Sequence, residues 1–229
     1  MVLRCLDLEG ELAESAARTL AREFPDLRVE VRREGFESHL RIDPSAEPRA
    51  AERAEAKLRR LLGPTLFEEE SFPAAVVHAL RSAMKTIALA ESLTAGLASS
   101  LLAEVPGASE VLEGSMVTYS TELKARWLGV PRGVLAEFGP VSEPTARAMA
   151  EGVLARSGAD LAVALTGWAG PGPGADGQPA GTVYLALADP ASSTHVEHRL
   201  FSGDRDEVRR KAALRALDLL RRRALGRPA

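Results

Sequence analysis

The sequence has little cysteine, histidine or aromatic content and no long hydrophobic run. Cys5 is the only cysteine among 229 residues, which excludes an internal disulfide and a metal cluster built from cysteines. No apolar stretch approaches the roughly 20 residues that a helix needs to cross a bilayer. Charged residues at Arg4 and Asp7 interrupt any signal-peptide core. We therefore expect a cytoplasmic protein that does not enter a membrane.

Lysine is scarce as well, and the chain carries no excess of positive charge. The net charge is −3 and the isoelectric point is near 5.9, so the overall charge does not support binding to nucleic acid. The arginines at 221–223 lie in a segment that also carries acids, which indicates a solvated helix face. Only four lysines accompany twenty-five arginines. A buried lysine can lose its proton whereas arginine cannot, so a lysine near a strand end is a candidate base.

The first seventy residues predict a small α+β domain with the order β-α-β-β-α-β. Apolar and charged residues alternate in 27–33, as in a half-buried strand, whereas leucine and alanine recur at helical spacing in 10–24. We expect strands at 2–6, 27–33, 39–42 and 65–67, and helices at 10–24 and 46–62. The acidic stretch 67–71 marks a boundary, so the predicted domains are 1–70 and 71–229.

The rest of the chain alternates strands with helices. Continuous apolar runs at 86–92 and 160–166 are typical of strands buried on both faces, and Ser142 is placed to cap a following helix. We expect strands at 86–92, 114–120, 160–166, 181–189 and 194–201, and helices at 72–84, 94–104, 143–156 and 204–225. Such alternation predicts an α/β fold, with a three-layer α/β/α main domain and a small α+β N-terminal domain.

Ser92 is the most informative residue of the main domain. It ends the apolar run 86–92, and a helical pattern begins directly after it. Open α/β sheets bind ligands at the carboxyl ends of their strands, where helix N-termini offer N–H groups to an anion. Ser92 is therefore a candidate nucleophile, and it needs a base to take its proton.

Lysine is the base that the sequence offers. None of the four histidines has an aspartate partner at a useful spacing, and Ala90 breaks the Gly-x-Ser-x-Gly pattern of α/β-hydrolases. A Ser–Lys pair remains, with Lys124 as the base and Tyr119 as its helper. Lys85 precedes the strand that leads to Ser92, so we expect it at the wrong end of the sheet. The alternative is that Tyr119 is a core residue and Lys124 a surface residue, and the spacing alone favours it.

Two further segments have the residue types of a binding site. The loop 166–174 is rich in glycine and proline and follows a strand, so its backbone N–H groups could approach an anion. It lacks the Gly-Lys-Ser/Thr of a Walker A loop, and a strand follows it where a dinucleotide fingerprint needs a helix. Arg205 stands in the first turn of the last helix, where the helix dipole disfavours a cation, and this indicates an anionic ligand. A plain connection and a surface arginine are the alternatives.

Taken together and in order, these motifs resemble the CinA C-terminal domain family, whose stand-alone members are nicotinamide mononucleotide deamidases. The resemblance covers residues from about 72 to 225. It rests on AESLTAG at 90–96, VPGAS at 105–109, Tyr119-Ser120 with Lys124, LGV at 128–130, VSE at 141–143, TG at 166–167, AGPG at 169–172, GTVY at 181–184 and GDR at 203–205. Residues 1–70 are similar to the small KH-like domain of CinA proteins, but they have no evident Gly-x-x-Gly loop.

This resemblance implies hydrolysis of the carboxamide of nicotinamide mononucleotide to nicotinate mononucleotide and ammonia. It implies Ser92 as the nucleophile, Lys124 as the base and Tyr119 as its helper. The residues that it implies for substrate binding are Thr94, Gly96, Gly107, Thr166, Gly167, Gly170, Gly172 and Arg205. It further implies a reaction without a metal or a cofactor, and a homodimer. The net charge and the missing Gly-x-x-Gly loop make a nucleic-acid partner unexpected.

Four positions depart from the family pattern. Leu93 and Ala95 stand where cysteine and glycine are usual, Thr121 replaces an asparagine, and Trp168 is bulky for the glycine loop. Leu93 and Ala95 could narrow or reshape the pocket. These departures favour an alternative interpretation, in which the chain is a catalytically degenerate scaffold or binding protein linked to competence or the DNA damage response. A third interpretation is an amidase for another small substrate.

Overall fold

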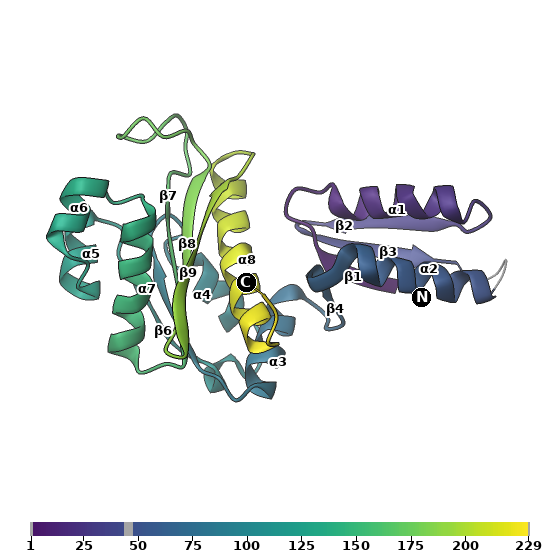
Figure 1. Ribbon diagram of the computed structural model, residues 1–229, viewed down its shortest axis with the longest axis horizontal. Helices are drawn as coiled ribbons and strands as arrows, with labels where there is room; N and C mark the ends of the chain where they lie inside the picture. Colours follow the sequence, from purple (N-terminus) through teal and green to yellow (C-terminus); the bar gives the residue numbers. More distant parts are fainter. Residues whose placement is uncertain (1, 44–47, 229) are drawn as a thin grey trace. The chain divides into compact units, whose positions relative to one another are not determined.

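Two compact units make up the chain, residues 1–75 and 76–229. The structure is a computed structural model that describes residues 2–43 and 48–228. Each unit has its own sheet, antiparallel in the first unit and mixed in the second (Figure 1). This confirms the α/β class with a small α+β N-terminal part. The division falls inside helix α3 (Phe72–Ser82), whereas the sequence placed a boundary just before this helix.

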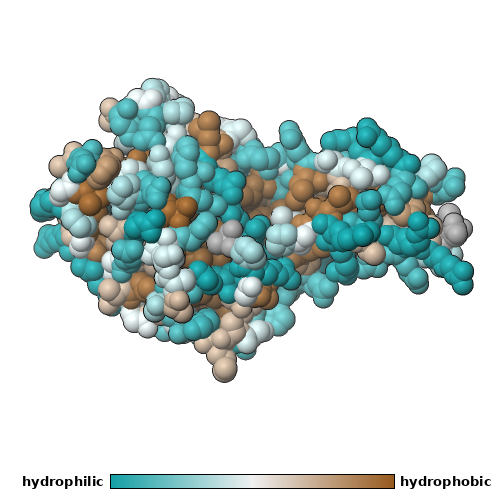
Figure 2. All heavy atoms as spheres, viewed as in Figure 1, coloured by the Kyte–Doolittle hydropathy of each residue, from teal (hydrophilic) through white to brown (hydrophobic). Residues whose placement is uncertain are grey.

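The first unit is a four-stranded sheet with the strand order β2-β3-β1-β4 and two helices. Alternate apolar residues of the strands share one core with α1 and α2, while the outward surface of α1 is hydrophilic (Figure 2). Residues 46 and 47 of the second predicted helix lie outside the described residues. The elements are β1 (Val2–Leu6), α1 (Leu12–Glu23), β2 (Val29–Glu34), β3 (Glu37–Ile42), α2 (Pro48–Leu62), the 3₁₀ turn η1 (Gly63–Thr65) and β4 (Leu66–Phe67).

Helix α1 begins at Leu12 rather than at Gly10, because the buried carboxylate of Asp7 closes its N-terminus. This carboxylate accepts hydrogen bonds from the N–H groups of Leu12 at 3.2 Å and Ala13 at 3.1 Å. It also accepts from the N–H of Gly10 at 2.9 Å and from the hydroxyl of Ser38, on β3, at 3.2 Å. A single side chain thus satisfies N–H groups at the helix start and joins the helix to the sheet.

The second unit is built on a five-stranded sheet with the order β6-β5-β7-β8-β9. Strands β6, β5 and β7 are parallel, and β8 and β9 run antiparallel to their neighbours. Helix α7 covers one face and α4 and α8 cover the other (Figure 1), which gives the three layers that the sequence predicted. The elements are β5 (Ile87–Glu91), α4 (Leu97–Ala103), the 3₁₀ turn η2 (Ala108–Glu110), β6 (Leu112–Val117), α5 (Thr121–Leu128), α6 (Arg132–Phe138), α7 (Glu143–Ser157), β7 (Leu161–Gly167), β8 (Thr182–Asp189), β9 (Ser192–Leu200) and α8 (Arg205–Ala224).

Small residues let α7 pack close to its neighbours. The alanines of β5 and β7 that face α7 form one buried cluster with Met149 and Val153 of that helix. Successive side chains of a strand point to opposite faces, so the larger residues between those alanines fill the other side of the sheet. At Gly152 a side chain is excluded, because a Cβ atom there would lie 2.0 Å from the carbonyl oxygen of Leu128. This close approach holds the C-terminal end of α5 against α7.

Strand β6 begins and ends earlier than the predicted strand 114–120. Gly114 lies inside it, where the register with β5 shifts between Ile87 and Ala88. The backbone pairing continues just past the strand, because the N–H of Thr118 donates to the carbonyl of Glu91 at 2.8 Å. Beyond that bond the chain leaves the sheet and enters α5.

Over residues 2–43 and 48–228, no helix is both long and apolar enough to span a membrane.

Helix α8 is fixed to β9 by a buried cluster of charges. The guanidinium of Arg215 makes a two-pronged contact with the carboxylate of Glu197, with both distances 2.7 Å. It also donates to Asp218 at 2.7 Å, and Asp218 accepts in turn from Arg222 at 2.7 Å. Such planar pairs are among the strongest charge-assisted hydrogen bonds. The helix that begins with Arg205 is therefore held firmly against the sheet.

Candidate active site

Ser92 lies at the carboxyl edge of the main sheet, directly after strand β5. Its N–H donates to the carbonyl of Leu165, on β7, at 3.1 Å. The carbonyl of Ser92 accepts from the N–H of Ala95 at 3.1 Å, which turns the chain tightly toward α4. Ala95 has a positive φ of 51° and Gly96 one of 93°. The backbone on either side of Ser92 is thus fixed, and its hydroxyl lines a pocket.

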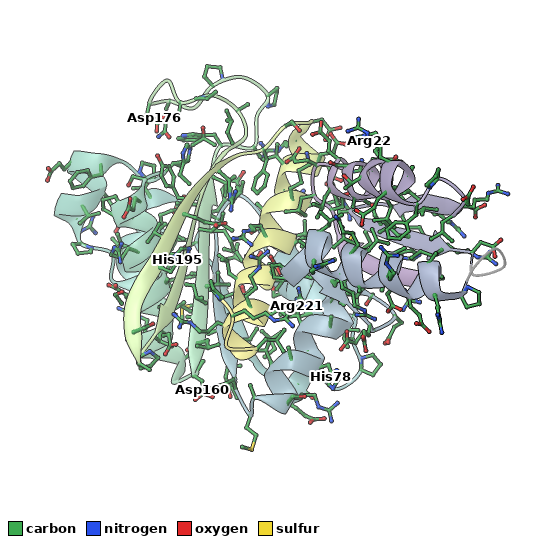
Figure 3. All side chains as sticks on the ribbon, turned by 45° about the vertical axis from the view of Figure 1, so that its right-hand side comes forward. Arg22, His78, Asp160, Asp176, His195 and Arg221 are labelled. Carbon is green, nitrogen blue, oxygen red and sulfur yellow. The ribbon has the colours of Figure 1, made fainter. Side chains whose placement is uncertain are left out.

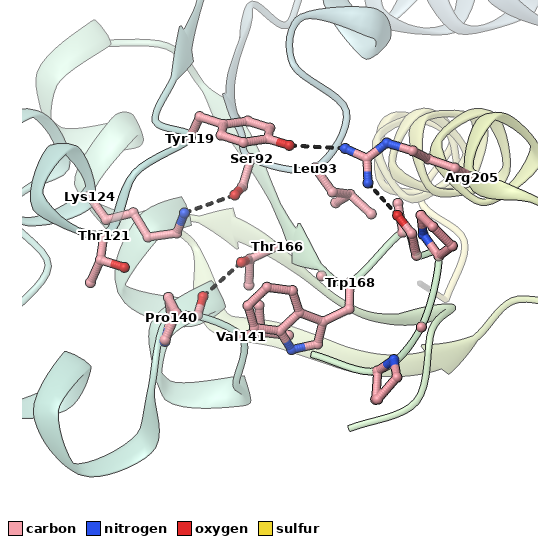
Figure 4. A pocket seen from close by; sticks show the side chains of 16 residues that line it. Ser92, Leu93, Tyr119, Thr121, Lys124, Pro140, Val141, Thr166, Trp168 and Arg205 are labelled. Carbon is pink, nitrogen blue, oxygen red and sulfur yellow. Dashed lines mark hydrogen bonds between the residues drawn. The ribbon is translucent and has the colours of Figure 1, made fainter. Parts of the chain in front are cut away.

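Lys124 reaches Ser92 from the inner face of α5. Its Nζ lies 2.8 Å from Ser92 Oγ and donates to the carbonyl of Thr118 at 2.8 Å. The helix starts where it does because the hydroxyl of Ser120 accepts from the N–H of Leu123 and so caps the first turn. The structure therefore brings together the serine and the lysine that the sequence singled out (Figure 4).

Burial changes the acidity of this lysine. Lys124 is 1% exposed, and no carboxylate of residues 2–43 and 48–228 forms an ion pair with it. Loss of water around the ammonium lowers the pKa of Lys124 from 10.5 to about 8. A neutral amine is therefore accessible near neutral pH, and its lone pair can take a proton from a hydroxyl 2.8 Å away.

The pocket around this pair has a volume of about 230 Å³. Thr166 is fully buried in its wall, and its hydroxyl donates to the carbonyl of Pro140 at 2.7 Å. Arg205 extends from the start of α8 over the opposite wall, where its guanidinium donates to Tyr119 Oη at 3.0 Å and to the carbonyl of Gly170 (Figure 4). The pocket thus combines a buried reactive pair with one arginine at its mouth.

Tyr119 lies at the mouth and not beside the lysine. It is 58% exposed, and its hydroxyl contacts Arg205. No hydrogen bond between described residues links Tyr119 to Lys124. The expected helper of the base is therefore, in this structure, part of the rim that holds the arginine.

The glycine loop supplies one side of the pocket. Gly167, Gly170 and Gly172 all line it, as does Trp168. Leu93 and Thr121, two of the positions that depart from the family pattern, line it as well. Ala95 does not, since it is exposed on the turn behind Ser92. Of the unusual residues, Leu93, Thr121 and Trp168 are thus the ones able to shape what enters.

Three residues that the resemblance implied for substrate binding are not brought to the pocket. Thr94 is fully buried behind it, and the N–H of Gly96 donates to Glu91 at 3.0 Å. Gly107 precedes β6, at the amino ends of the parallel strands, beside Arg81. Figure 3 labels Asp160 and Asp176, which lie at opposite ends of this sheet. Gly107 lies at the same end as Asp160, because each precedes one of the parallel strands.

The other candidate bases lie elsewhere. Lys85 also precedes β5 and pairs with Asp160 at 3.3 Å, at the amino end of the sheet where the sequence analysis placed it. No histidine lines the pocket that holds Ser92, among the residues that the structure describes. Neither do these residues contain a group of three or more histidine, cysteine, aspartate or glutamate side chains arranged to hold a metal ion.

Sequence reasoning missed two residues that hold the turn after Ser92. The buried carboxylate of Glu91 accepts from the N–H groups of Ala98 at 3.1 Å and Ser99 at 3.0 Å, and so caps α4. On the other side, Arg209 donates to the carbonyls of Leu93 at 3.1 Å and Thr94 at 3.0 Å. Two signals were available, because Glu91 is an acid between an apolar strand and a helix, and Arg209 stands one helical turn after Arg205.

The fold and this geometry define a three-layer α/β protein with a buried Ser–Lys pair at the carboxyl edge of its sheet. Residues 69–224 match the CinA C-terminal domain family, and the chain belongs to that family. A CinA-like protein of Myxococcus xanthus is 39% identical over 235 residues, which cover 100% of this chain and 56% of that protein. For a CinA-like protein of Geobacter sulfurreducens the identity is 45% over 191 residues, with 81% and 46% covered. The chain thus spans about half the length of the curated relatives it matches.

Solved structures of the same superfamily have the same main unit. A competence-damaged protein (CinA) superfamily protein from Klebsiella pneumoniae 700603 matches with a TM-score of 0.65 and 32% identity, covering 68% of this chain and 96% of that one. A competence/damage inducible protein from Agrobacterium tumefaciens matches with a TM-score of 0.63 and 35% identity, covering 65% and 91%. The similarity of residues 1–70 to a KH-like domain stays a prediction.

Proposed function

We propose that this chain hydrolyses the carboxamide of nicotinamide mononucleotide to nicotinate mononucleotide and ammonia. The observation that carries the proposal is the contact of 2.8 Å between Ser92 Oγ and Lys124 Nζ, in which burial lowers the pKa of the lysine to about 8. A serine hydroxyl becomes a nucleophile when a base takes its proton, and a buried lysine is an accepted base in such pairs. Membership of the CinA family supports the choice of substrate.

In the first step, Ser92 Oγ attacks the carboxamide carbon while the neutral amine of Lys124 takes the hydroxyl proton. The tetrahedral intermediate collapses as the C–N bond breaks, and the lysine gives the proton to the leaving nitrogen, which departs as ammonia. The product of this step is an ester between the nicotinoyl group and Ser92. One base can serve as the acid in the same step because its proton is returned to the substrate.

In the second step, water attacks the ester carbon and Lys124 takes a proton from it. The C–O bond to Ser92 then breaks, and the proton passes from the lysine to Ser92 Oγ. The acid product loses its proton to solvent and leaves as the carboxylate, and the pair regains its starting protonation. The carbonyl of Thr118, which accepts from Lys124 Nζ at 2.8 Å, keeps the amine directed along one line through both steps.

Recognition of the nucleotide end is assigned to the mouth of the pocket. Arg205 is the arginine that lines the pocket, and a guanidinium binds phosphate oxygens in a two-pronged manner. In the structure the guanidinium is held by Tyr119 Oη and the carbonyl of Gly170. These contacts fix its position before the ligand arrives, so little conformational entropy is lost on binding.

Ammonia release from nicotinamide mononucleotide tests the proposal. The wild-type chain should release it, whereas Ser92→Ala and Lys124→Ala should not. Lys85→Ala is the matched control, because this lysine forms an exposed ion pair at the far end of the sheet and should leave the rate unchanged. Undiminished release by either pocket variant would refute the mechanism. No release by the wild type together with no affinity in calorimetry would favour the scaffold interpretation.

A further inference from the structure

Trp168 occupies a defined place at the pocket. It directly follows strand β7, and its N–H donates to the carbonyl of Thr182 at 2.8 Å. Its own carbonyl accepts from the N–H of Gly181 at 2.7 Å. These two bonds close the base of the loop 168–181 and set the starting point of the indole. The side chain lies along the pocket wall near Val141 and Thr166 (Figure 4).

The loop holds the indole in one orientation. Its Nε1 donates to Asp176 Oδ2 at 3.2 Å, and that oxygen also accepts from Gln178 Nε2 at 2.7 Å. Gln178 Nε2 donates as well to the carbonyl of Val141 at 3.0 Å, on the wall beside the indole. At Gly174 the chain passes so close that a Cβ atom would lie 2.3 Å from the ring. The aromatic wall is therefore preorganised before a ligand binds.

The charges of the pocket decide what such a wall can attract. The lining residues include two cations, Lys124 and Arg205, and no carboxylate among the residues that the structure describes. They include two aromatic side chains, Trp168 and Tyr119. A ligand with an anionic end is drawn to the arginine. A positively charged ring in the same ligand is attracted to the face of an aromatic side chain, and indole attracts cations most strongly of these side chains.

We infer that Trp168 is a specificity-determining residue that stacks on the flat, positively charged ring of an aromatic carboxamide. The inference rests on the proposed function, because it assigns the ring of the substrate to this wall and its anionic end to Arg205. It predicts selection for cationic aromatic amides over aliphatic amides and over uncharged rings. It also gives a role to a residue that is unusually large for the glycine loop.

Fluorescence can report this contact directly, because the chain has only two tryptophans. Trp127 lies on α5, is 46% exposed and does not line the pocket. In Ser92→Ala/Trp127→Phe the signal comes from Trp168 alone, and the substrate is not consumed. Nicotinamide mononucleotide should quench it saturably, whereas ribose 5-phosphate, which lacks the ring, should not. The matched variant Ser92→Ala/Trp168→Phe keeps Trp127 and should show no quenching.

Kinetics of single variants supply the second measurement. In Trp168→Leu the KM for nicotinamide mononucleotide should rise by about tenfold with little change in kcat, and Trp168→Phe should fall between it and the wild type. Competition by ribose 5-phosphate should be unchanged in Trp168→Leu, since that ligand uses Arg205 only. The reduced mononucleotide has an uncharged ring. In the wild type it should bind about tenfold more weakly than the oxidised mononucleotide, and in Trp168→Leu the two should bind equally well.

The outcomes separate this inference from the proposed reaction. Saturable quenching of Trp168 without ammonia release supports the inference and refutes the reaction. Ammonia release with no quenching and an unchanged KM in Trp168→Leu overturns the inference and leaves the reaction standing. Equal weakening of ribose 5-phosphate and of the mononucleotide in Trp168→Leu also overturns it, because the change would then be a general distortion of the pocket.

Discussion

The floor and the rim of the pocket are built differently. On the floor, Ser92, Lys124 and Thr166 are 7%, 1% and 0% exposed, and each has a hydrogen-bond partner within the fold. On the rim, Tyr119 and Arg205 are exposed and contact one another. The buried end of β5 and the inner face of α5 thus hold the reacting atoms, while loops and the start of α8 present the groups that meet the ligand. The residues that carry out the reaction are therefore separate from those that bind the ligand, and substitutions in the floor and in the rim can test the two groups separately.

The largest effect is expected on the floor, at Lys124. Lys124→Met keeps the length of the side chain and removes the amine, and Lys124→Arg keeps a charge that cannot be lost. Both should lower kcat/KM by about 10³-fold, the range that a general base supplies. Thermal unfolding should confirm that both variants fold. Activity of Lys124→Arg within tenfold of the wild type would show that charge, and not proton transfer, is what the floor provides.

The next largest effect is expected on the rim, at Arg205. Arg205→Ala should raise KM by roughly 10- to 100-fold, the worth of hydrogen bonds to a charged group, with a smaller change in kcat. Arg210→Ala is the control, because that arginine pairs with Asp206 at 2.8 Å on the exposed side of the same helix and does not line the pocket. A loss in kcat alone for Arg205→Ala would place this residue in the chemistry instead.

A smaller effect, again on the floor, is the response to pH. Because the base must be neutral and the pKa of Lys124 is about 8, kcat/KM should rise about tenfold from pH 7 to pH 9. Relative to Lys124→Met, the free energy of unfolding should rise between pH 8 and 10.5, since there the unfolded chain binds the proton that the folded chain has released. Initial rates and denaturant titrations across this range measure both. The rate should be flat in Lys124→Met, whose free energy of unfolding should fall above pH 9.0 because burial raises the pKa of Cys5 to about 12.

The smallest effect concerns the turn that joins floor and helix. Ala95 has a φ of 51° and is exposed, so Ala95→Gly should stabilise the fold by up to about 1 kcal/mol without removing a contact. Gly96 has a φ of 93°, and a Cβ there would meet only Val117, at 3.8 Å. Gly96→Ala should therefore destabilise by about 1 kcal/mol through backbone strain alone. Chemical denaturation measures the change in the free energy of unfolding for both variants. Changes of the same sign would contradict the assignment of backbone strain to these positions.

The floor was predictable from the sequence because it depends on local patterns. The buried runs around β5 and β7 are readable as strands, and a serine at the end of the first must lie at the carboxyl edge of the sheet. The scarcity of lysine then narrowed its partner to Lys124. Both residues lie where those patterns put them, 2.8 Å apart.

The rim was less predictable because it depends on distant contacts. The guanidinium of Arg205 reaches Tyr119 Oη across 86 positions of the chain, and no local pattern indicates such a bond. Tyr119 was expected beside the base, yet the chain leaves the sheet just before it and turns it outward. Gly107 is a different case, since the strand that follows it places it at the amino end of the sheet. A shared motif aligns a residue with its counterpart in the family, but only the strand topology decides at which end of the sheet the residue lies.

The pairing of β7 with β8 has a consequence for how such a protein diversifies. The two strands are antiparallel neighbours, and the loop between them enters and leaves the fold at one point, closed by the bonds of Trp168 with Thr182 and Gly181. Segments anchored in this way tolerate insertion and replacement, since little of the remaining fold depends on their length. A change in residues 169–180 should therefore alter recognition, because it would remove the Gly170 carbonyl that holds Arg205 and the Asp176 carboxylate that holds Trp168, while Ser92 and Lys124 stay in place.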